Sequence, residues 1–208
     1  ILILTPRSAA SANAFKIDIM TELAAVIAFS AITNHDKVGA ILFSDKIEKY
    51  LPPQKGKQNI LRIIRELVNV TPSQKGTNLN EALIYLNNIE KKRSIAFILS
   101  DFKSSNYEQS LAIAAKKHDI IGIKFNDGRE KQLPDAGLIY LQDAESDERK
   151  LVDTSHPIVR QNWKQFFQQE QITFQSIFNR AKCDTISLDT QDDYVMAMQL
   201  FFKKRARR

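Results

Sequence analysis

The sequence predicts an α/β domain with a mostly parallel sheet that is covered by helices on both faces. Short apolar runs of strand length alternate with longer amphipathic stretches along most of the chain. Several of these runs are apolar at almost every position, as in strands buried on both faces. Strands that alternate with helices imply crossover connections, and crossovers join parallel strands.

The strands are read from the apolar runs. They are predicted at 1–4, 37–44, 94–100, 120–125 and 184–189. The segment KIEKYL at 46–51 alternates in polarity, which is typical of an edge strand, and we expect Pro52 and Pro53 to end it.

The helices fill the stretches between these strands. They are predicted at 18–33, 56–70, 79–90, 107–117, 155–182 and 192–205. Asn78 is the expected N-cap of the third helix, because its short side chain can accept a backbone N–H bond. The long fifth helix has Pro157 in its first turn and is expected to be capped by Thr154 or Ser155.

Residues 136–153 depart from the alternation of strands and helices. Two strand-like segments flank an acidic turn, which predicts a small inserted β-hairpin. An aromatic stripe then follows the long helix, and we expect it to pack in the core, with a partner-binding face as the alternative. The stripe comprises Trp163, Phe166, Phe167, Phe174 and Phe178.

Composition bounds the class of protein. A length of 208 residues fits a single domain over 1–208, and the start inside a strand without Met favours a fragment of a longer chain. The single cysteine, Cys183, excludes an internal disulfide. No apolar stretch is long enough to span a bilayer, and we expect a cytoplasmic protein. The net charge is +6, but the last six residues carry five positive charges, so the remainder carries +1. Such a tail can bind nucleic acid or an anionic membrane, but a solvated helix end, whose cations suit the helix dipole, explains it better.

The loops after the strands are where a functional site is expected. Ligands of such folds bind beyond the carboxyl ends of the strands, at the point where the strand order reverses. The loops in question are 5–15, 44–45, 76–78, 101–106 and 126–133. Within them, Asp101 and Thr77 offer oxygen ligands for a hard cation, although each could equally cap a helix or anchor a loop.

Other common chemistries lack their motifs. The sequence has no glycine-rich phosphate loop and no Gly-x-Ser-x-Gly elbow. Three histidines, His35, His118 and His156, fall at predicted element ends in polar surroundings, where we expect structural turn residues.

Three stretches together resemble a known bacterial family. They are ELAAVIAFSAITNHDKVGAILFSDKIEKYLPPQKGKQNILRIIREL, GTNLNEALIYLN and KKRSIAFILSDF. They are similar to the "domain of unknown function 58" family, whose members carry a von Willebrand factor A-like domain and are often encoded beside MoxR-type AAA+ ATPases. The resemblance implies a six-stranded Rossmann-like sheet and a metal-ion-dependent adhesion site, in which Thr77 matches the site's Thr and Asp101 its Asp.

The first element of that adhesion site is not matched. TPRSA at 5–9 stands where the resemblance calls for Asp-x-Ser-x-Ser, with Thr5 in place of Asp and Arg7 in place of the first Ser. A site with one carboxylate would bind Mg²⁺ or Mn²⁺ weakly or not at all. Arg7 could instead neutralise Asp101 through a bidentate contact.

Two functions follow from these readings. The leading one is a non-enzymatic protein-interaction module with a degenerate adhesion site, in which Arg7, Ser8, Thr77 and Asp101 contact an AAA+ ATPase or its client. The alternative is a metal-dependent, phosphohydrolase-like enzyme that uses Asp101 as ligand or nucleophile. No helper Lys or His is identifiable for the alternative.

Overall fold

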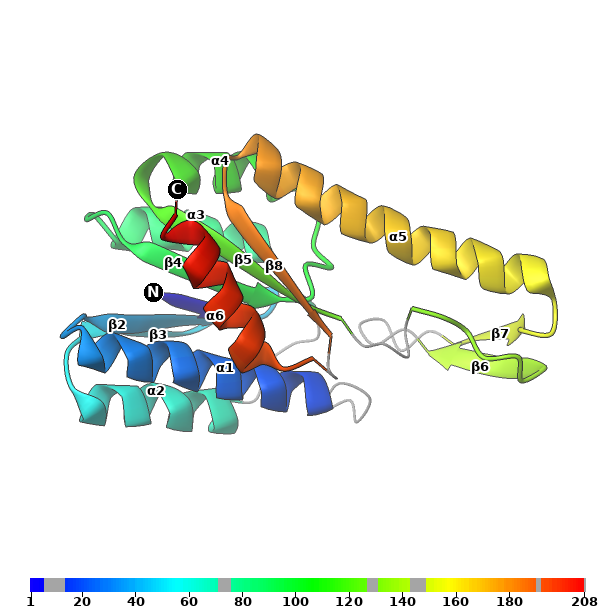
Figure 1. Cartoon of the computed structure of the whole chain (residues 1–208), viewed down its shortest axis with the longest axis horizontal. Coiled ribbons are helices and arrows are strands. Elements are labelled where there is room, and N and C mark those ends of the chain that lie inside the picture. The colour runs from blue at the N-terminus through cyan, green and yellow to red at the C-terminus, as the bar shows by residue number, and fades with distance from the viewer. Residues whose placement is uncertain (6–13, 71–75, 127–130, 143–148, 190–191, 208) are drawn as a thin grey trace.

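The structure is a computed structural model that describes residues 1–5, 14–70, 76–126, 131–142, 149–189 and 192–207 (Figure 1). Its centre is a six-stranded sheet with the strand order β3-β2-β1-β4-β5-β8. The strands are β1 (Leu2–Leu4), β2 (Val38–Phe43), β3 (Ile47–Gln54), β4 (Ile95–Ser100), β5 (Asp119–Asn126) and β8 (Asp184–Asp189). All neighbours are parallel except β2 and β3, so the predicted mostly parallel sheet is confirmed.

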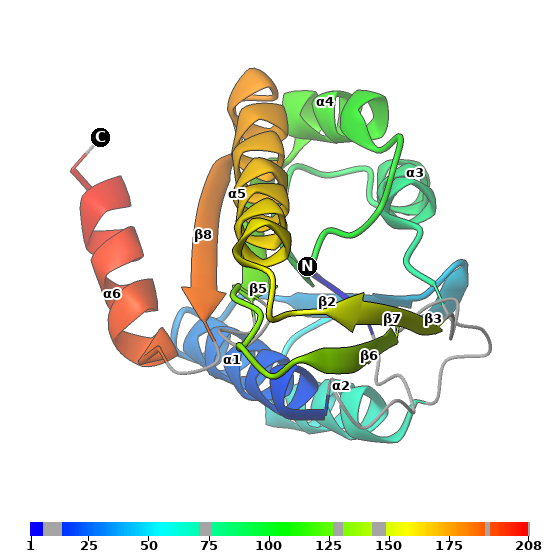
Figure 2. The same ribbon diagram turned by 90° about the vertical axis from the view of Figure 1, so that its right-hand side faces the viewer.

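Helices cover both faces of this sheet. On one face lie α1 (Ala14–Thr33), α2 (Lys57–Asn69) and α6 (Tyr194–Arg205), and on the other α3 (Leu79–Ile89), α4 (Glu108–Lys117) and α5 (Pro157–Arg180). Figure 2 shows α1 and α2 below the sheet and α3 and α4 above it. The apolar side chains form two cores, because a strand turns alternate residues to opposite faces. Leu2 and Leu4 join one core, and Ile3 joins the other.

The edge strand β3 continues through both prolines, so the predicted end at Pro52 was wrong. Its pairing with β2 is interrupted by a register shift between Val38 and Ala40. Proline is tolerated there because an edge strand or a bulge does not need every N–H for the ladder. Gly39 makes the close approach possible, since a Cβ there would lie 2.8 Å from the Leu51 carbonyl oxygen.

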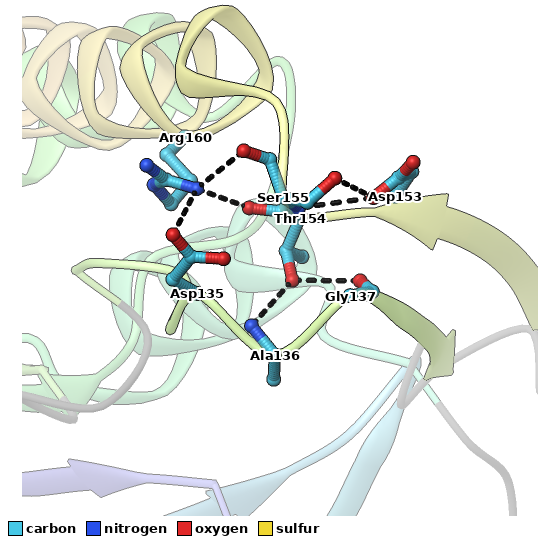
Figure 3. Close-up of polar contacts among 7 residues, drawn as sticks. All are labelled: Asp135, Ala136, Gly137, Asp153, Thr154, Ser155 and Arg160. Carbon is cyan, nitrogen blue, oxygen red and sulfur yellow. Dashed lines mark hydrogen bonds and ion pairs between the residues drawn. The ribbon is translucent and has the colours of Figure 1, made fainter.

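The predicted hairpin forms a separate two-stranded sheet of β6 (Leu138–Gln142) and β7 (Arg149–Asp153). Together with the N-terminal half of α5 it extends from the body of the molecule as an arm (Figure 1). The prediction that Thr154 or Ser155 caps α5 was wrong, because the N-cap position is His156. Instead, the fully buried Thr154 hydroxyl donates to the Gly137 carbonyl (2.8 Å) and accepts from the Ala136 N–H (3.1 Å) (Figure 3).

Arg160 completes the join between hairpin and helix. Its guanidinium donates to the carbonyl oxygens of Thr154 and Ser155, and it lies 3.1 Å from the Asp135 carboxylate (Figure 3). Since a two-stranded hairpin by itself is only marginally stable, these polar contacts fix the base of the hairpin to the first turn of α5.

The aromatic stripe on α5 is only partly buried. Phe174 and Phe178 are 2% and 0% exposed, as expected for core residues, but Phe166 is 61% exposed. The whole stripe was predicted to pack in the core, and for Phe166 this is wrong. The N-terminal half of α5 belongs to the arm and extends beyond the sheet, so no core lies beneath it (Figure 1).

His118 lies at the end of a helix, as predicted, but it is buried there and not in the polar surroundings that were expected. It is buried at the end of α4, with Nδ1 3.0 Å from the Ser94 hydroxyl. Burial, with a smaller contribution from Lys117, lowers its pKa. Among the helices that the structure describes, none is both long enough and apolar enough to cross a membrane.

Candidate functional site

The strand order reverses at β1, and this places a candidate site at the carboxyl ends of the neighbouring strands. β1 pairs with β2 on one side and β4 on the other, with Leu4 opposite Leu42 and Leu99. The three strands therefore end at the same level. The described loops after β2 and β4, together with the residues that lead into α3, are here called the carboxyl edge. They lie at the position where such sheets bind ligands.

The loop after β4 is tightly held around Asp101. The Lys103 N–H donates to Asp101 Oδ1 (3.2 Å), and the Phe102 N–H donates to the Ser100 hydroxyl (3.1 Å). Phe102 adopts a φ of 57°, a left-handed conformation that bulky residues rarely occupy. Such strain persists only where the surroundings enforce it.

The surroundings of Phe102 are an aromatic cluster. Its buried ring lies 4.5 Å from Phe174 and 5.3 Å from Phe178, measured between centroids. Tyr107, 6.4 Å away, completes the cluster, and burial raises the pKa of its phenol to about 12. Packing of Phe102 into the core thus fixes the backbone beside Asp101, and it connects the carboxyl edge to the C-terminal half of α5.

A second loop, which carries Thr77, is bonded to the first. The Asn78 N–H donates to the Ser44 carbonyl at the end of β2 (2.7 Å), and Asn78 Oδ1 caps α3 by accepting from the Glu81 N–H (3.1 Å). The predicted N-cap is therefore confirmed. The Leu79 N–H donates to the Ser104 hydroxyl (3.1 Å). The start of α3 is thus hydrogen-bonded both to the end of β2 and to the loop after β4, and these bonds keep the loops adjacent.

These loops enclose an open cleft of about 420 Å³. It is lined by Asp45, Thr77, Asn78, Asn80, Lys103, Ser104, Ser105 and Asn106. Thr77 lines the cleft, whereas the half-buried Asp101 is not among the lining residues, although it precedes the cleft residue Lys103 by two positions and its carboxylate accepts the Lys103 N–H. Arg7 and Ser8 lie outside the described residues.

Sequence reasoning indicated the loops of this cleft but missed several of its residues. Asp45 and Asn106 fall in loops that were singled out, yet no local motif marks them as binding residues. Asn80 belongs to the first turn of α3, and its Oδ1 accepts from the Ser110 hydroxyl (2.6 Å). Only the packing of α3 against α4 brings that amide to the cleft.

The chemistry of the cleft is that of hydrogen bonding. Its lining consists of hydroxyl, amide, one carboxylate and one ammonium side chain, which suit the polar groups of a peptide. Oxygen ligands of the kind that Mg²⁺ prefers are present in Thr77 and Asp45. However, nowhere in the described part of the chain do three His, Cys, Asp or Glu side chains gather closely enough to hold a metal ion.

Comparison with known proteins gives the family. The chain matches the family described as "Protein of unknown function DUF58" over residues 4–173. It belongs to this family. Uncharacterized proteins of Mycobacterium bovis and Mycobacterium tuberculosis are each 30% identical to it over 134 residues. That alignment spans 63% of this chain and 42% of either relative, so the chain corresponds to less than half of those proteins.

Two solved structures share the fold of this DUF58 chain. BatB from Bacteroides thetaiotaomicron has a TM-score of 0.57 at 12% identity, and each chain is covered fully. An aerotolerance-related membrane protein from Bacteroides fragilis has a TM-score of 0.58 at 11% identity, again with full coverage of both chains. At these identities the likeness concerns the mixed α/β fold alone.

Proposed function

We propose that this DUF58 chain is a non-enzymatic protein-interaction module with a von Willebrand factor A-like fold. The strand order centred on β1, with helices on both faces, supports that fold. The observation that carries the function is the open polar cleft at the carboxyl edge. Its loops are fixed in advance by the bonds of Asn78 and Ser104, so a partner meets a preformed surface and little ordering opposes binding.

The lining of the cleft favours binding over catalysis. A nucleophile needs a base within hydrogen-bond reach. Ser104 instead accepts the backbone N–H of Leu79, and the described histidines do not line the cleft. Asp101 is engaged by the N–H of Lys103, which suits a residue that holds a loop in place and lends it negative charge.

Divalent cations have a minor role in this proposal. Thr77 and Asp101 occupy the Thr and Asp positions of the adhesion site that the family resemblance implies. A cation there would bridge to a carboxylate of the partner. With so few acidic groups nearby, we propose that the cation is bound weakly and that the hydrogen-bonding groups of the cleft supply most of the affinity.

The proposed partner is a MoxR-type AAA+ ATPase or a client that it remodels. This rests on the resemblance of the sequence to proteins encoded beside such ATPases. It is tested with the purified MoxR-type ATPase of the same organism by biolayer interferometry. Thr77→Val removes a hydroxyl, and Asp101→Asn removes a charge while it keeps the oxygen that accepts the Lys103 N–H. Thr33→Val and Asp36→Asn, at exposed positions at the opposite edge of the sheet, are the matched controls.

Thr77→Val and Asp101→Asn are here called the cleft variants, although only Thr77 lines the cleft. Each is expected to bind at least about tenfold more weakly, since a hydrogen bond to a charged group contributes about 1.5–3 kcal/mol. The controls should bind as the wild-type chain does. Omission of Mg²⁺ should change the affinity less than either cleft variant. Equal affinity for all four variants, or turnover of a phosphoester that Asp101→Asn abolishes, would contradict the proposal.

A further inference from the structure

The edge of the sheet opposite the cleft is strongly basic. Parallel strands begin there and most helices end there, and Figure 1 shows both chain termini on this side. Six segments form this surface, here called the basic edge. They are residues 34–37, 55–57, 90–93, 116–119, 180–184 and 203–207.

The charge of the basic edge exceeds that of the whole chain. Its segments contain fourteen Lys and Arg residues and four Asp and Glu residues, a balance of +10. The complete sequence carries +6, so everything outside these segments carries −4. The positive charge was expected to belong to the tail alone. Folding instead brings the tail together with cations from five other loops.

Most of these cations are exposed, and the tail is anchored among them. Lys91, Lys92 and Arg93 are exposed in the loop before β4. Arg205 forms ion pairs with Asp119 and Asp184, at the starts of β5 and β8. These pairs neutralise two of the four acids and fix the end of α6 on the basic edge. Helix C-termini add partial negative charge, but their effect falls off within a turn.

The outward face of α6 extends this surface with apolar residues. Met198 packs inward at 5% exposure, whereas Met196 and Leu200 are 59% and 56% exposed. Residues at i, i+4, i+7 and i+8 share one face of a helix, so Lys203 and Lys204 lie on the same outward face as Met196 and Leu200. The helix contains no acidic residue. Apolar side chains thus lie directly beside an exposed cationic cluster.

We infer that the basic edge and the outward face of α6 dock on an anionic phospholipid membrane. Cations attract acidic headgroups, and exposed apolar side chains enter the boundary between headgroups and acyl chains. Nucleic acid is the other polyanion that such charge could attract. It is recognised by cations together with base-stacking aromatic or base-reading side chains. The exposed large apolar residues of α6 and of the start of β4 include Ile95, Val195, Met196, Leu200 and Phe202. All except Phe202 are aliphatic or thioether groups suited to lipid, and the Phe202 ring packs edge-on against Phe97 and Phe201.

Vesicle flotation tests this inference with the full chain. The vesicles are phosphatidylcholine alone, or phosphatidylcholine with phosphatidylserine at a ratio of about two to one. Lys91→Glu/Lys92→Glu/Arg93→Glu reverses three exposed charges on the basic edge. Lys46→Glu/Arg149→Glu/Lys164→Glu reverses three exposed charges elsewhere and is the matched control. Met196→Ser/Leu200→Ser removes the apolar contribution without a change in charge.

The wild-type chain should bind the vesicles that contain phosphatidylserine and should not bind those of phosphatidylcholine alone. Its affinity for the acidic vesicles should fall as the salt concentration rises. Each lost cation near an anionic surface weakens binding about fivefold, so the basic-edge triple variant should lose binding by about a hundredfold or more. The control triple variant should lose far less. The serine double variant should bind several-fold more weakly.

Three results would overturn the inference. One is the absence of binding to acidic vesicles at low salt. Another is an equal loss in the two triple variants, which would indicate an effect of net charge without a defined surface. The third is tight binding of a short DNA duplex that displaces the vesicles and is unaffected by Met196→Ser/Leu200→Ser, which would assign the basic edge to nucleic acid. Circular dichroism of each variant confirms that it is folded.

Discussion

The contact between Gly122 and Phe178 provides a sharp test of how the core supports the candidate site. A Cβ at Gly122 would lie 2.5 Å from Cε1 and 2.7 Å from Cζ of Phe178. Carbon atoms in contact are normally about 3.5–4.0 Å apart, so the ring would have to move by about 1 Å. The ring is fully buried between Phe174 and Phe102, with centroids 4.9 and 5.3 Å away, and it has little room to move.

Gly122→Ala is therefore expected to lower the free energy of unfolding by about 1–3 kcal/mol, the usual cost of overpacking. In a chain of this size each kcal/mol lowers the melting temperature by about 2–4 °C. Urea denaturation measures the free energy, and thermal unfolding provides an independent check. Because Phe102 directly follows Asp101, displacement of the ring should also weaken partner binding at the cleft.

A double-mutant cycle with Phe178→Leu isolates the contact. The smaller side chain leaves space for the new methyl group, so Gly122→Ala should cost at least about 0.5 kcal/mol less in that background than in the wild-type chain. Two results would contradict this explanation. One is an equal loss of unfolding free energy for Gly122→Ala in both backgrounds, and the other is a urea midpoint for Gly122→Ala equal to that of the wild-type chain. Either would show that the Phe178 ring does not clash with the added methyl group.

Three further predictions concern buried polar and aromatic groups. Thr154→Val should cost about 1–3 kcal/mol in urea denaturation, because the Ala136 N–H loses its acceptor; Thr154→Ser should cost less, and equal costs would contradict this. Phe174→Ser should destabilise by about 3–5 kcal/mol, whereas exposed Phe166→Ser should stay within about 0.5 kcal/mol. Burial lowers the pKa of His118 from its ordinary 6.5, so the unfolded chain binds more protons and stability should decline as the pH falls below about 6.5. The decline in stability should be smaller in His118→Gln. If the variant and the wild-type chain had the same dependence of stability on pH, His118 would not be its cause.

The sheet could be predicted because its signals are local. Runs such as KVGAILFS are apolar at successive positions only when both faces of a strand are buried, and the observed β2 is buried throughout. The predicted ends of strands and helices were less accurate where a residue typical of an element end has another role in the structure. Pro52 and Pro53 resemble a strand end, but a bulge on an edge strand accommodates both. Thr154 resembles a helix cap, but its hydroxyl closes the base of the hairpin instead.

The candidate site was partly predictable for the same reason. Asp101 follows from the rule that loops at the carboxyl ends of parallel strands meet, whereas Thr77, which precedes α3, was indicated by the family resemblance. The role of both residues in binding stays a prediction. The amide of Asn80 carries no comparable signal, since a polar residue in the first turn of a helix is common. Its place in the cleft depends on how α3 packs against α4.

The sequence by itself determined which segments are strands and helices, because hydrophobic periodicity acts over a few residues. It also determined that Asp101 would directly follow a strand and that Thr77 would precede a helix. Only the tertiary structure decided the contents of each surface. It placed Phe102 against Phe178, left Phe166 exposed on the arm, and gathered six dispersed charged segments into the basic edge. These outcomes depend on contacts between residues far apart in the chain, which no local pattern encodes.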